Sequence, residues 1–121
     1  MSIKFSLKKV RERYIRVVEA PGAVFHVKPM GFDEEVAFDK SFQTFDRQTK
    51  QMVTTDLGAH LKAKAVRVIL GWTGLPGEDG DIPYSTENLE TLCVTAPGMI
   101  YAVLRDAGAA DAVEVEEAAK N

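Results

Sequence analysis

The chain has 121 residues, of which 45% are apolar and 27% charged, with one cysteine and a formal net charge of -3. This length fits a single domain, and the apolar fraction is sufficient for a hydrophobic core, which argues against global disorder. One cysteine excludes an intramolecular disulfide framework and a cysteine-rich zinc site, as is typical of a reducing compartment. Because no apolar run has the length of a transmembrane helix or a signal peptide, we expect a cytoplasmic location.

Charge is distributed unevenly along the sequence. Residues 1–16 carry six bases and one acid, residues 17–77 are neutral, and residues 78–121 carry ten acids against two bases. Such asymmetry can steer an acidic partner or a nucleic acid to one end, or let copies of the chain meet head to tail. It is equally compatible with two ends that are simply solvated.

The N-terminal part of the sequence predicts a small antiparallel β-region. One half-buried strand is predicted by three apolar residues that alternate with polar ones, Ile3, Phe5 and Leu7. Two runs of β-branched and aromatic residues flank Pro21-Gly22, a pair that suits a tight turn, and they predict a β-hairpin over residues 13–28. Pro29 cannot donate to a strand ladder, so the hairpin is expected to end there.

The middle of the sequence predicts two helices. Three acids at residues 33–35 suit a first helical turn, because they complement the helix dipole, and we expect a helix over residues 33–46. A polar connector over residues 47–53 precedes a second helix over residues 55–71, whose apolar positions recur every three or four residues. β-branched residues near the end of this second segment also favour a strand, so a strand is the alternative there.

The last part predicts a loop and two more helices. Four glycines and one proline among residues 71–81 predict the loop. Ser85 or Thr86 can cap the next helix, which is expected to stop near Pro97. A final short helix is expected to end at Gly108, a residue type that favours helix C-termini.

These patterns together predict an α+β fold with a small N-terminal antiparallel β-region and hairpin, a mainly α-helical bundle and a flexible acidic C-terminal tail. Residues 1–108 are expected to form a single globular domain, with the β-region at 1–29 and the helical part at 32–108. Residues 109–121 are expected to be a disordered acidic tail, since alanine and acids dominate there and apolar anchors are few.

The sequence contains no constellation typical of catalysis or metal binding. The acids within residues 78–81 lack the spacing of an EF-hand loop. His26 and His60 lie on different predicted elements, and neither has a ligand-type neighbour at helical spacing. Cys93 lies among apolar residues, which favours a buried structural thiol. We therefore expect no enzyme activity, no cofactor and no metal.

Nucleotides and nucleic acids are also disfavoured as partners. No phosphate-binding loop motif is present, and the glycines after Gly71 are followed by acids, which repel phosphate. The basic N-terminus could neutralise nucleic-acid phosphates, but no helix-turn-helix or zinc-finger pattern accompanies it. We therefore expect neither a nucleic acid nor a membrane as partner.

One stretch, from Val68 to Leu92, carries a recognisable motif. A hydrophobic segment ends in Gly-Trp, an Asp-Gly turn follows, and a Pro-aromatic-Ser-x-Glu-Asn sequence starts a helix. The motif residues are Gly71, Trp72, Gly74, Asp79, Gly80, Pro83, Tyr84, Ser85, Glu87, Asn88, Leu89 and Leu92. This pattern resembles the tail assembly chaperones of long-tailed, siphovirus-type bacteriophages. Since these residue types form turns, caps and a core, we expect them to be structural.

The resemblance implies a non-enzymatic chaperone that binds the tape-measure protein, keeps it soluble and helps the tail tube assemble around it. It implies action in the host bacterial cytoplasm during infection and absence from the mature virion. Many family members also have a longer, frameshifted form, through which the tail-tube subunit would be recruited. Family behaviour and the oppositely charged ends together predict a homo-oligomer, either a ring or a spiral.

Two other functional classes are open at this point. A structural tail subunit or head-tail connector is the alternative, because such proteins are also small, acidic and α+β. A small enzyme is disfavoured, because no base, nucleophile and orienting partner can be placed together.

Overall fold

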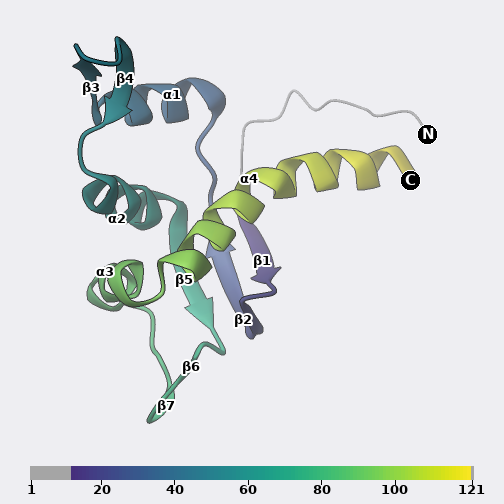
Figure 1. The fold of residues 1–121 in the computed structure, drawn as a ribbon. Helices are drawn as coiled ribbons and strands as arrows, with labels where there is room; N and C mark the ends of the chain where they lie inside the picture. Colours follow the sequence, from purple (N-terminus) through teal and green to yellow (C-terminus); the bar gives the residue numbers. More distant parts are fainter. Residues whose placement is uncertain (1–11, 121) are drawn as a thin grey trace.

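The computed structural model describes residues 12–120, and the side chains of residues 12–108 (Figure 1). Its elements are β1 (Arg13–Val17), β2 (Ala20–Val27), α1 (Phe32–Lys40), β3 (Gln43–Asp46), β4 (Gln51–Thr54), α2 (Leu57–Val68), β5 (Ile69–Thr73), β6 (Pro76–Gly77), β7 (Gly80–Asp81), α3 (Thr86–Thr95) and α4 (Pro97–Lys120). The predicted α+β class is confirmed. The strand expected around Phe5 lies outside the described residues. No helix in the described part of the chain is both long and apolar enough to cross a membrane.

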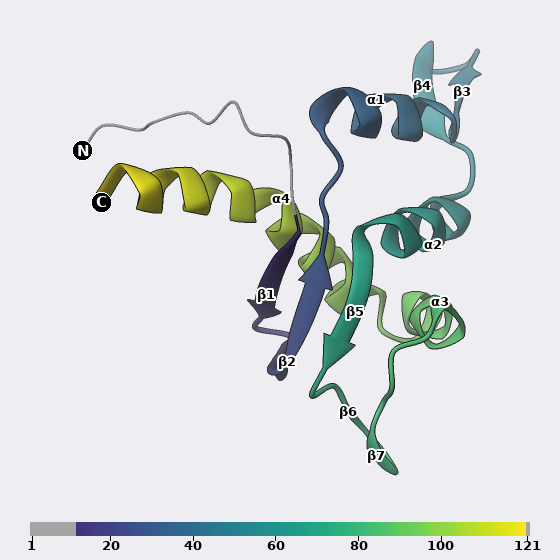
Figure 2. The same ribbon diagram turned by 180° about the vertical axis from the view of Figure 1, so that it is seen from behind.

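A three-stranded antiparallel sheet, in the order β1-β2-β5, forms the centre of the fold. Tyr14 lies opposite His26 in the first pair, and Phe25 lies opposite Trp72 in the second. Helix α4 crosses one face of this sheet, and α2 and α3 pack beside it (Figure 1). Figure 2 shows the sheet from behind, where none of the helices in the described residues covers its other face.

The core lies between the sheet and these three helices. Alternate residues of β2 are buried, because successive side chains of a strand point to opposite faces. The helices contribute residues three or four positions apart, which share one helix face. The largest fully buried side chains are Phe25, Ile69, Leu89, Ile100, Val27 and Val103. Removing each from water stabilises the fold by about 1.5 to 3 kcal/mol, which makes this cluster the main source of stability.

The N-terminal hairpin is present, but its turn is not where the sequence predicts. The turn lies at residues 18–19, and Pro21-Gly22 lie within β2. The pairing of β1 with β2 is irregular between Ile15 and Val17, so the proline does not interrupt a regular ladder. The prediction of a turn at Pro21-Gly22 is therefore wrong, since the turn lies at residues 18–19.

The helix predicted over residues 33–46 is too long. Helix α1 ends at Lys40, and the Ser41 hydroxyl donates to the carbonyl oxygen of Phe38. The segment expected to be the end of this helix and a polar connector instead forms the antiparallel pair β3 and β4. Two local features support the turn between them: Asp46 accepts a hydrogen bond from the backbone N–H of Gln48, and Lys50 has a positive φ of 57°.

The helix predicted over residues 55–71 ends three residues early. Helix α2 stops at Val68, and the chain continues directly as β5, which was the alternative for this β-branched segment. Pairing with β2 buries Ile69 and Trp72, and this tertiary contact outweighs local helix propensity. Residues 71–81, where a loop is expected, contain the end of β5 and the two short strands β6 and β7.

The C-terminal helix differs from its prediction in length. Helix α3 begins where expected, whereas α4 starts at Pro97 and continues through Gly108 to Lys120. A proline fits the first turn of a helix, because the N–H that it lacks has no partner there. Residues 109–120, expected to be a disordered tail, continue the helix in the structure. Alanine and glutamate dominate this stretch, and both favour helix.

Replacement of Trp72 by alanine should lower the free energy of unfolding by about 3 to 5 kcal/mol, as expected when a large aromatic side chain leaves a cavity in a core. Trp72 is only 7% exposed. Leu70→Ala, at an exposed position of the same strand, should change stability by less than about 0.5 kcal/mol. Urea denaturation of both variants measures this difference. A near-neutral Trp72→Ala would contradict a core role.

Candidate partner-binding surface

Trp72 links the sheet to the segment that leads into α3. Its indole N–H donates to the carbonyl oxygen of Ile82 at 2.8 Å. The ring also meets Phe25 and Tyr84 edge-on, with centroid distances of 6.3 and 4.9 Å. Tyr84 in turn donates from its hydroxyl to the carbonyl oxygen of Ile69 at 3.2 Å. These contacts hold β5 and the start of α3 in a fixed arrangement.

The start of α3 follows the predicted capping pattern. Ser85 accepts a hydrogen bond from the backbone N–H of Asn88 at 3.0 Å, which satisfies one free donor of the first turn. The Asn88 side chain donates to the carbonyl oxygen of Pro83 at 2.9 Å. Leu89 is fully buried, and Leu92 packs against the core. The side chains named here make contacts within the chain.

Two glycines of the motif, Gly74 and Gly80, have a positive φ. Gly74 has a φ of +70°, and a Cβ atom there would lie 2.5 Å from the carbonyl oxygen of Gly22. Gly80 has a φ of +112° and begins β7, directly after the exposed Asp79 of the β6–β7 turn. Gly71 does not end a helix as predicted, but lies on β5 opposite His26.

Glu87, like Asp79, is a motif residue at an exposed position. Its side chain is exposed on α3, and its backbone carbonyl accepts a hydrogen bond from the Thr91 hydroxyl. Trp72 and Tyr84 thus contact each other between β5 and α3, whereas Glu87 lies on the surface. The motif describes how the chain folds, so a partner-binding surface must be sought elsewhere.

Helix α1 and the β3–β4 hairpin form an arm at the periphery of the fold. No residue of α1 is buried, and the hairpin contributes none to the core cluster. In α1, Glu35 pairs with Lys64 of α2 at 3.0 Å, and Glu34 pairs with Arg67. Asp39 lies 2.8 Å from His60, and its carboxylate can only accept, so the imidazole Nε2–H donates. Polar contacts therefore attach much of the arm to α2.

An aromatic cluster completes the attachment of the arm. The ring of Phe38 lies 5.3 Å from that of Phe42 and 5.7 Å from that of His60, measured between centroids. Phe42 also meets His60 nearly edge-on at 5.3 Å. Phe38 is also partly buried and packs against the core cluster, so these rings, with the ion pairs, hold the arm against α2 and the core.

This arrangement shifts the pKa values of Asp39 and Lys64. Burial disfavours ionisation of Asp39, but the hydrogen bond from His60 and the charge of Lys64 outweigh burial, so the pKa of Asp39 lies below its ordinary value of 3.8. Burial likewise disfavours the charged form of Lys64, but the hydrogen bond and charge of Glu35 outweigh it and raise the pKa of Lys64 above 10.5. Both shifts favour the ion pairs near neutral pH.

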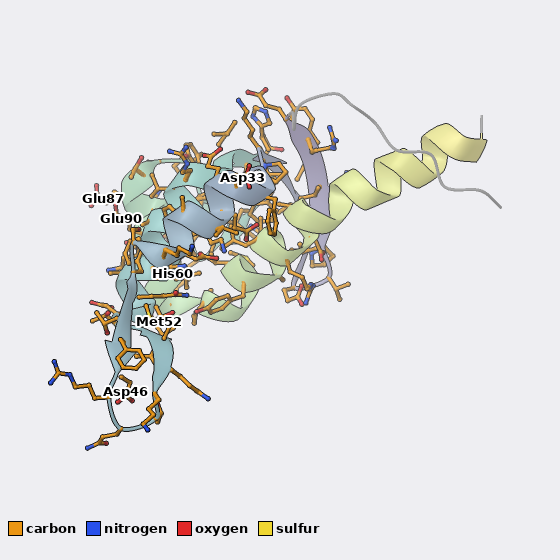
Figure 3. The ribbon with its side chains drawn as sticks, turned by 90° about the horizontal axis from the view of Figure 1, so that it is seen from above. Asp33, Asp46, Met52, His60, Glu87 and Glu90 are labelled. Carbon is orange, nitrogen blue, oxygen red and sulfur yellow. The ribbon has the colours of Figure 1, made fainter. Side chains whose placement is uncertain are left out.

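The hairpin of the arm carries large apolar side chains in solvent. Phe45 and Met52 lie directly opposite each other on β3 and β4, and they are 58% and 56% exposed. Val53 on the same hairpin is also exposed. Figure 3 shows Met52 on this hairpin, which projects away from the sheet, with Asp46 near its tip. A two-stranded hairpin gains no core stability from such residues, so we define Phe45 and Met52, which share one face of the hairpin, as the candidate partner-binding surface.

Sequence reasoning missed this surface because it assigned Phe45 to a helix and residues 47–53 to a connector. The signal was nevertheless present in two four-residue segments, Gln43–Asp46 and Gln51–Thr54, which flank four polar residues. Each segment contains residue types that favour strands, Thr44 and Phe45 in the first and Val53 and Thr54 in the second. Phe38 and Phe42, however, follow three acids at a spacing that fits a helix. This helical pattern led to the prediction of a helix that included Phe45.

The remaining reactive side chains take part in local packing. His26 stacks on Tyr14 with a centroid distance of 4.7 Å and lies 3.0 Å from Glu12. Cys93 is buried, and this burial raises the pKa of its thiol. Among the residues that the structure describes, no three His, Cys, Asp or Glu side chains are grouped so that they could hold a metal ion.

No family model, curated protein or solved structure was found to match this chain.

Replacement of Gly74 by alanine should destabilise the fold by more than about 1 kcal/mol, because a Cβ atom would require both a strained backbone and displacement of Gly22. Gly22→Ala is the matched control, since its Cβ atom would lie at an ordinary 3.7 Å from the nearest atom, the carbonyl oxygen of Gly74. Thermal unfolding of the two variants provides the comparison. Equal effects would show that the close approach at Gly74 is unimportant.

The contribution of Asp39 to the stability of the fold should disappear at acidic pH. Because folding lowers the pKa of Asp39, its stabilisation is present above pH 3.8 and is lost as the pH falls through the folded-state value. Unfolding free energies of the wild type and of Asp39→Asn should therefore differ at pH 5 to 6, and this difference should shrink below about pH 4. A difference that grows in acid would contradict the assigned ion pairs.

Proposed function

We propose that this chain is a bacteriophage tail assembly chaperone, which binds the tape-measure protein and keeps it soluble while the tail tube assembles around it. The observation that carries the proposal is the exposed apolar surface of the β3–β4 hairpin. The motif from Gly71 to Leu92 adds a sequence resemblance to that protein class. In this proposal the chain acts by contact and performs no catalysis.

The chemistry of the hairpin suits a long, apolar and helical partner. Phe45 offers a flat ring, and Met52 offers a flexible and polarizable side chain that adapts to irregular surfaces. Such side chains can fill the spaces between residues of an amphipathic helix, as in helix-in-groove recognition. A binding surface of this kind tolerates many partner sequences, which a chaperone of a long protein requires.

The position of the hairpin also supports a binding role. Its residues are absent from the core cluster, and its base is fastened by the backbone hydrogen bond from Thr55 to the carbonyl of Phe42 at 2.8 Å. The hairpin can therefore contact a partner without exposing the core. Truncation of its side chains should weaken binding without unfolding the chain.

The proposal extends to location and to a second partner. The chaperone would act in the cytoplasm of the host bacterium during infection and would be absent from the finished virion. Recruitment of the tail-tube subunit would fall to a longer, frameshifted form.

Co-expression with the neighbouring tape-measure gene product tests this function. The wild-type chain should raise the soluble fraction of that product, and Phe45→Ser combined with Met52→Ser should weaken capture by about tenfold or more, as loss of central apolar contacts usually does. The matched control is Val94→Ser combined with Tyr101→Ser, which removes side chains of similar exposure, 66% and 50%, from α3 and α4. Soluble yield and co-purification provide the readouts.

Two outcomes would count against the proposal. Unchanged solubility of the tape-measure product with the wild-type chain would contradict the chaperone function. Equal effects of the two double variants would instead reject the hairpin as the binding surface. Detection of the chain in purified virions by mass spectrometry would favour the alternative, a structural tail or head-tail connector subunit.

A further inference from the structure

An apolar pocket of about 320 Å³ lies where the start of β2, the base of the β6–β7 hairpin and the junction of α3 with α4 meet. Glu19 is the one lining residue with a polar side chain, and Leu75, Ile82 and Met99 are among the apolar ones. Figures 1 and 2 show the β1–β2 turn and the β6–β7 hairpin at the end of the molecule away from the arm. The pocket is therefore distinct from the candidate partner-binding surface.

The walls of this pocket are held by contacts within the chain. Leu75 belongs to the core cluster, and Ile82 and Met99 pack against it. The backbone N–H of Ile82 donates to the carbonyl oxygen of Leu75 at 2.8 Å, and the carbonyl of Ile82 accepts from the Trp72 indole at 2.8 Å. A preformed site of this kind loses little free energy through ordering when a partner binds.

The size of the pocket suits one large apolar side chain. A cavity of about 150 Å³ holds a benzene ring, so this pocket has room for a leucine, phenylalanine or tryptophan side chain. Pro21 and Pro76 line it and are exposed, which leaves the pocket open to solvent. Val18, which directly precedes Glu19, is 89% exposed and adds an apolar side chain at the β1–β2 turn.

The surroundings of the pocket are acidic. All of its lining residues lie within residues 17–25 and 68–104, and neither stretch contains a lysine, an arginine or a histidine. Four acids of these stretches are exposed on the β1–β2 turn and the β6–β7 hairpin, namely Glu19, Glu78, Asp79 and Asp81. The pocket thus combines an apolar interior with a surface of one sign of charge.

A base from outside these stretches acts on this end of the molecule but is already paired. The pKa of Arg105 is raised mainly by its hydrogen bond to Asp106 and to a smaller extent by the charge of Glu19. The guanidinium lies 2.9 Å from the Asp106 carboxylate. The other exposed acids attract cations and repel anions, which disfavours the phosphates of nucleic acids and lipids. A protein segment that carries lysine or arginine suits this surface.

We infer that this pocket binds a basic segment of a partner protein, which inserts one large apolar side chain. Lysine or arginine residues beside that side chain face Glu19 and the acids of the β6–β7 hairpin. The apolar side chain supplies most of the affinity, and the charges select the partner and steer its approach. This inference rests on the pocket and its acids, and it holds whether or not the chain binds a tape-measure protein through the arm.

Selection from a display library of random peptides of about 12 residues, on the immobilised full-length chain, tests the inference. Enriched peptides should combine a large apolar residue with several lysines or arginines. One enriched peptide is then synthesised with a fluorescent label, and its binding is measured by anisotropy. Raising the salt from about 0.02 M to about 0.5 M should weaken binding by about tenfold, because salt screens exposed charges.

One variant fills the pocket. Ala96 lines it, and its backbone makes the hydrogen bonds that join α3 to α4, which a longer side chain leaves in place. Ala96→Leu should weaken peptide binding by about tenfold or more, because the anchor side chain loses its space. Thr95→Leu is the matched control, since it adds the same side chain at the exposed neighbouring position. Circular dichroism of each variant establishes that it is folded.

A second variant removes charge and leaves the pocket open. Glu19→Gln, Glu78→Gln and Asp79→Asn combined should weaken binding by about tenfold, because each exposed ion pair contributes about two- to threefold. The matched control neutralises two glutamates and one aspartate on α3 and α1, Glu87→Gln, Glu90→Gln and Asp33→Asn (Figure 3). This control should bind the peptide as the wild type does.

Several results would overturn the inference. One is a selection that enriches no peptides, or enriches acidic ones. Another is peptide binding that Ala96→Leu leaves unchanged, or that Thr95→Leu weakens equally. Binding that is lost in Phe45→Ser combined with Met52→Ser, but kept in Ala96→Leu, would assign the peptide to the arm. Self-association of the wild-type chain that Ala96→Leu abolishes would make a second copy the occupant instead.

Discussion

Trp72 connects the central sheet to the segment that leads into α3. Its ring lies in the core beside Phe25, while its indole N–H reaches the carbonyl oxygen of Ile82 on the segment that leads into α3. A buried indole needs such a hydrogen-bond acceptor, because an unpaired N–H inside a protein is costly. Trp72 also contacts the ring of Tyr84, which directly precedes the Ser85 cap of α3. These contacts add to the core packing that holds α3 on the sheet.

The fold combines a conventional core with an arm that is held differently. The sheet and helices α2, α3 and α4 share one apolar cluster, whereas α1 contributes no buried residue. Ion pairs such as Glu35 with Lys64, and the rings of Phe38 and Phe42, attach the arm instead. Partly exposed ion pairs stabilise less than core packing does, so the arm is the part of the molecule best able to adjust to a partner.

The proposed partner-binding surface is apolar. The hairpin offers Phe45 and Met52 in solvent, which suits an apolar partner and depends little on salt.

The sequence by itself determined the features that depend on neighbouring residues: the α+β class, the N-terminal hairpin and the Ser85 cap of α3. Only the tertiary structure decided the features that depend on distant ones. Ile69 joins β5 rather than α2 because β2 lies ready to pair with it, and no local pattern reveals that neighbour. Phe45 belongs to a hairpin because β3 pairs with β4, and the sequence hides this pairing, since Phe38, Phe42 and Phe45 recur at a spacing that a helix also explains. The candidate surface was missed for the same reason, since exposure is a property of the folded chain.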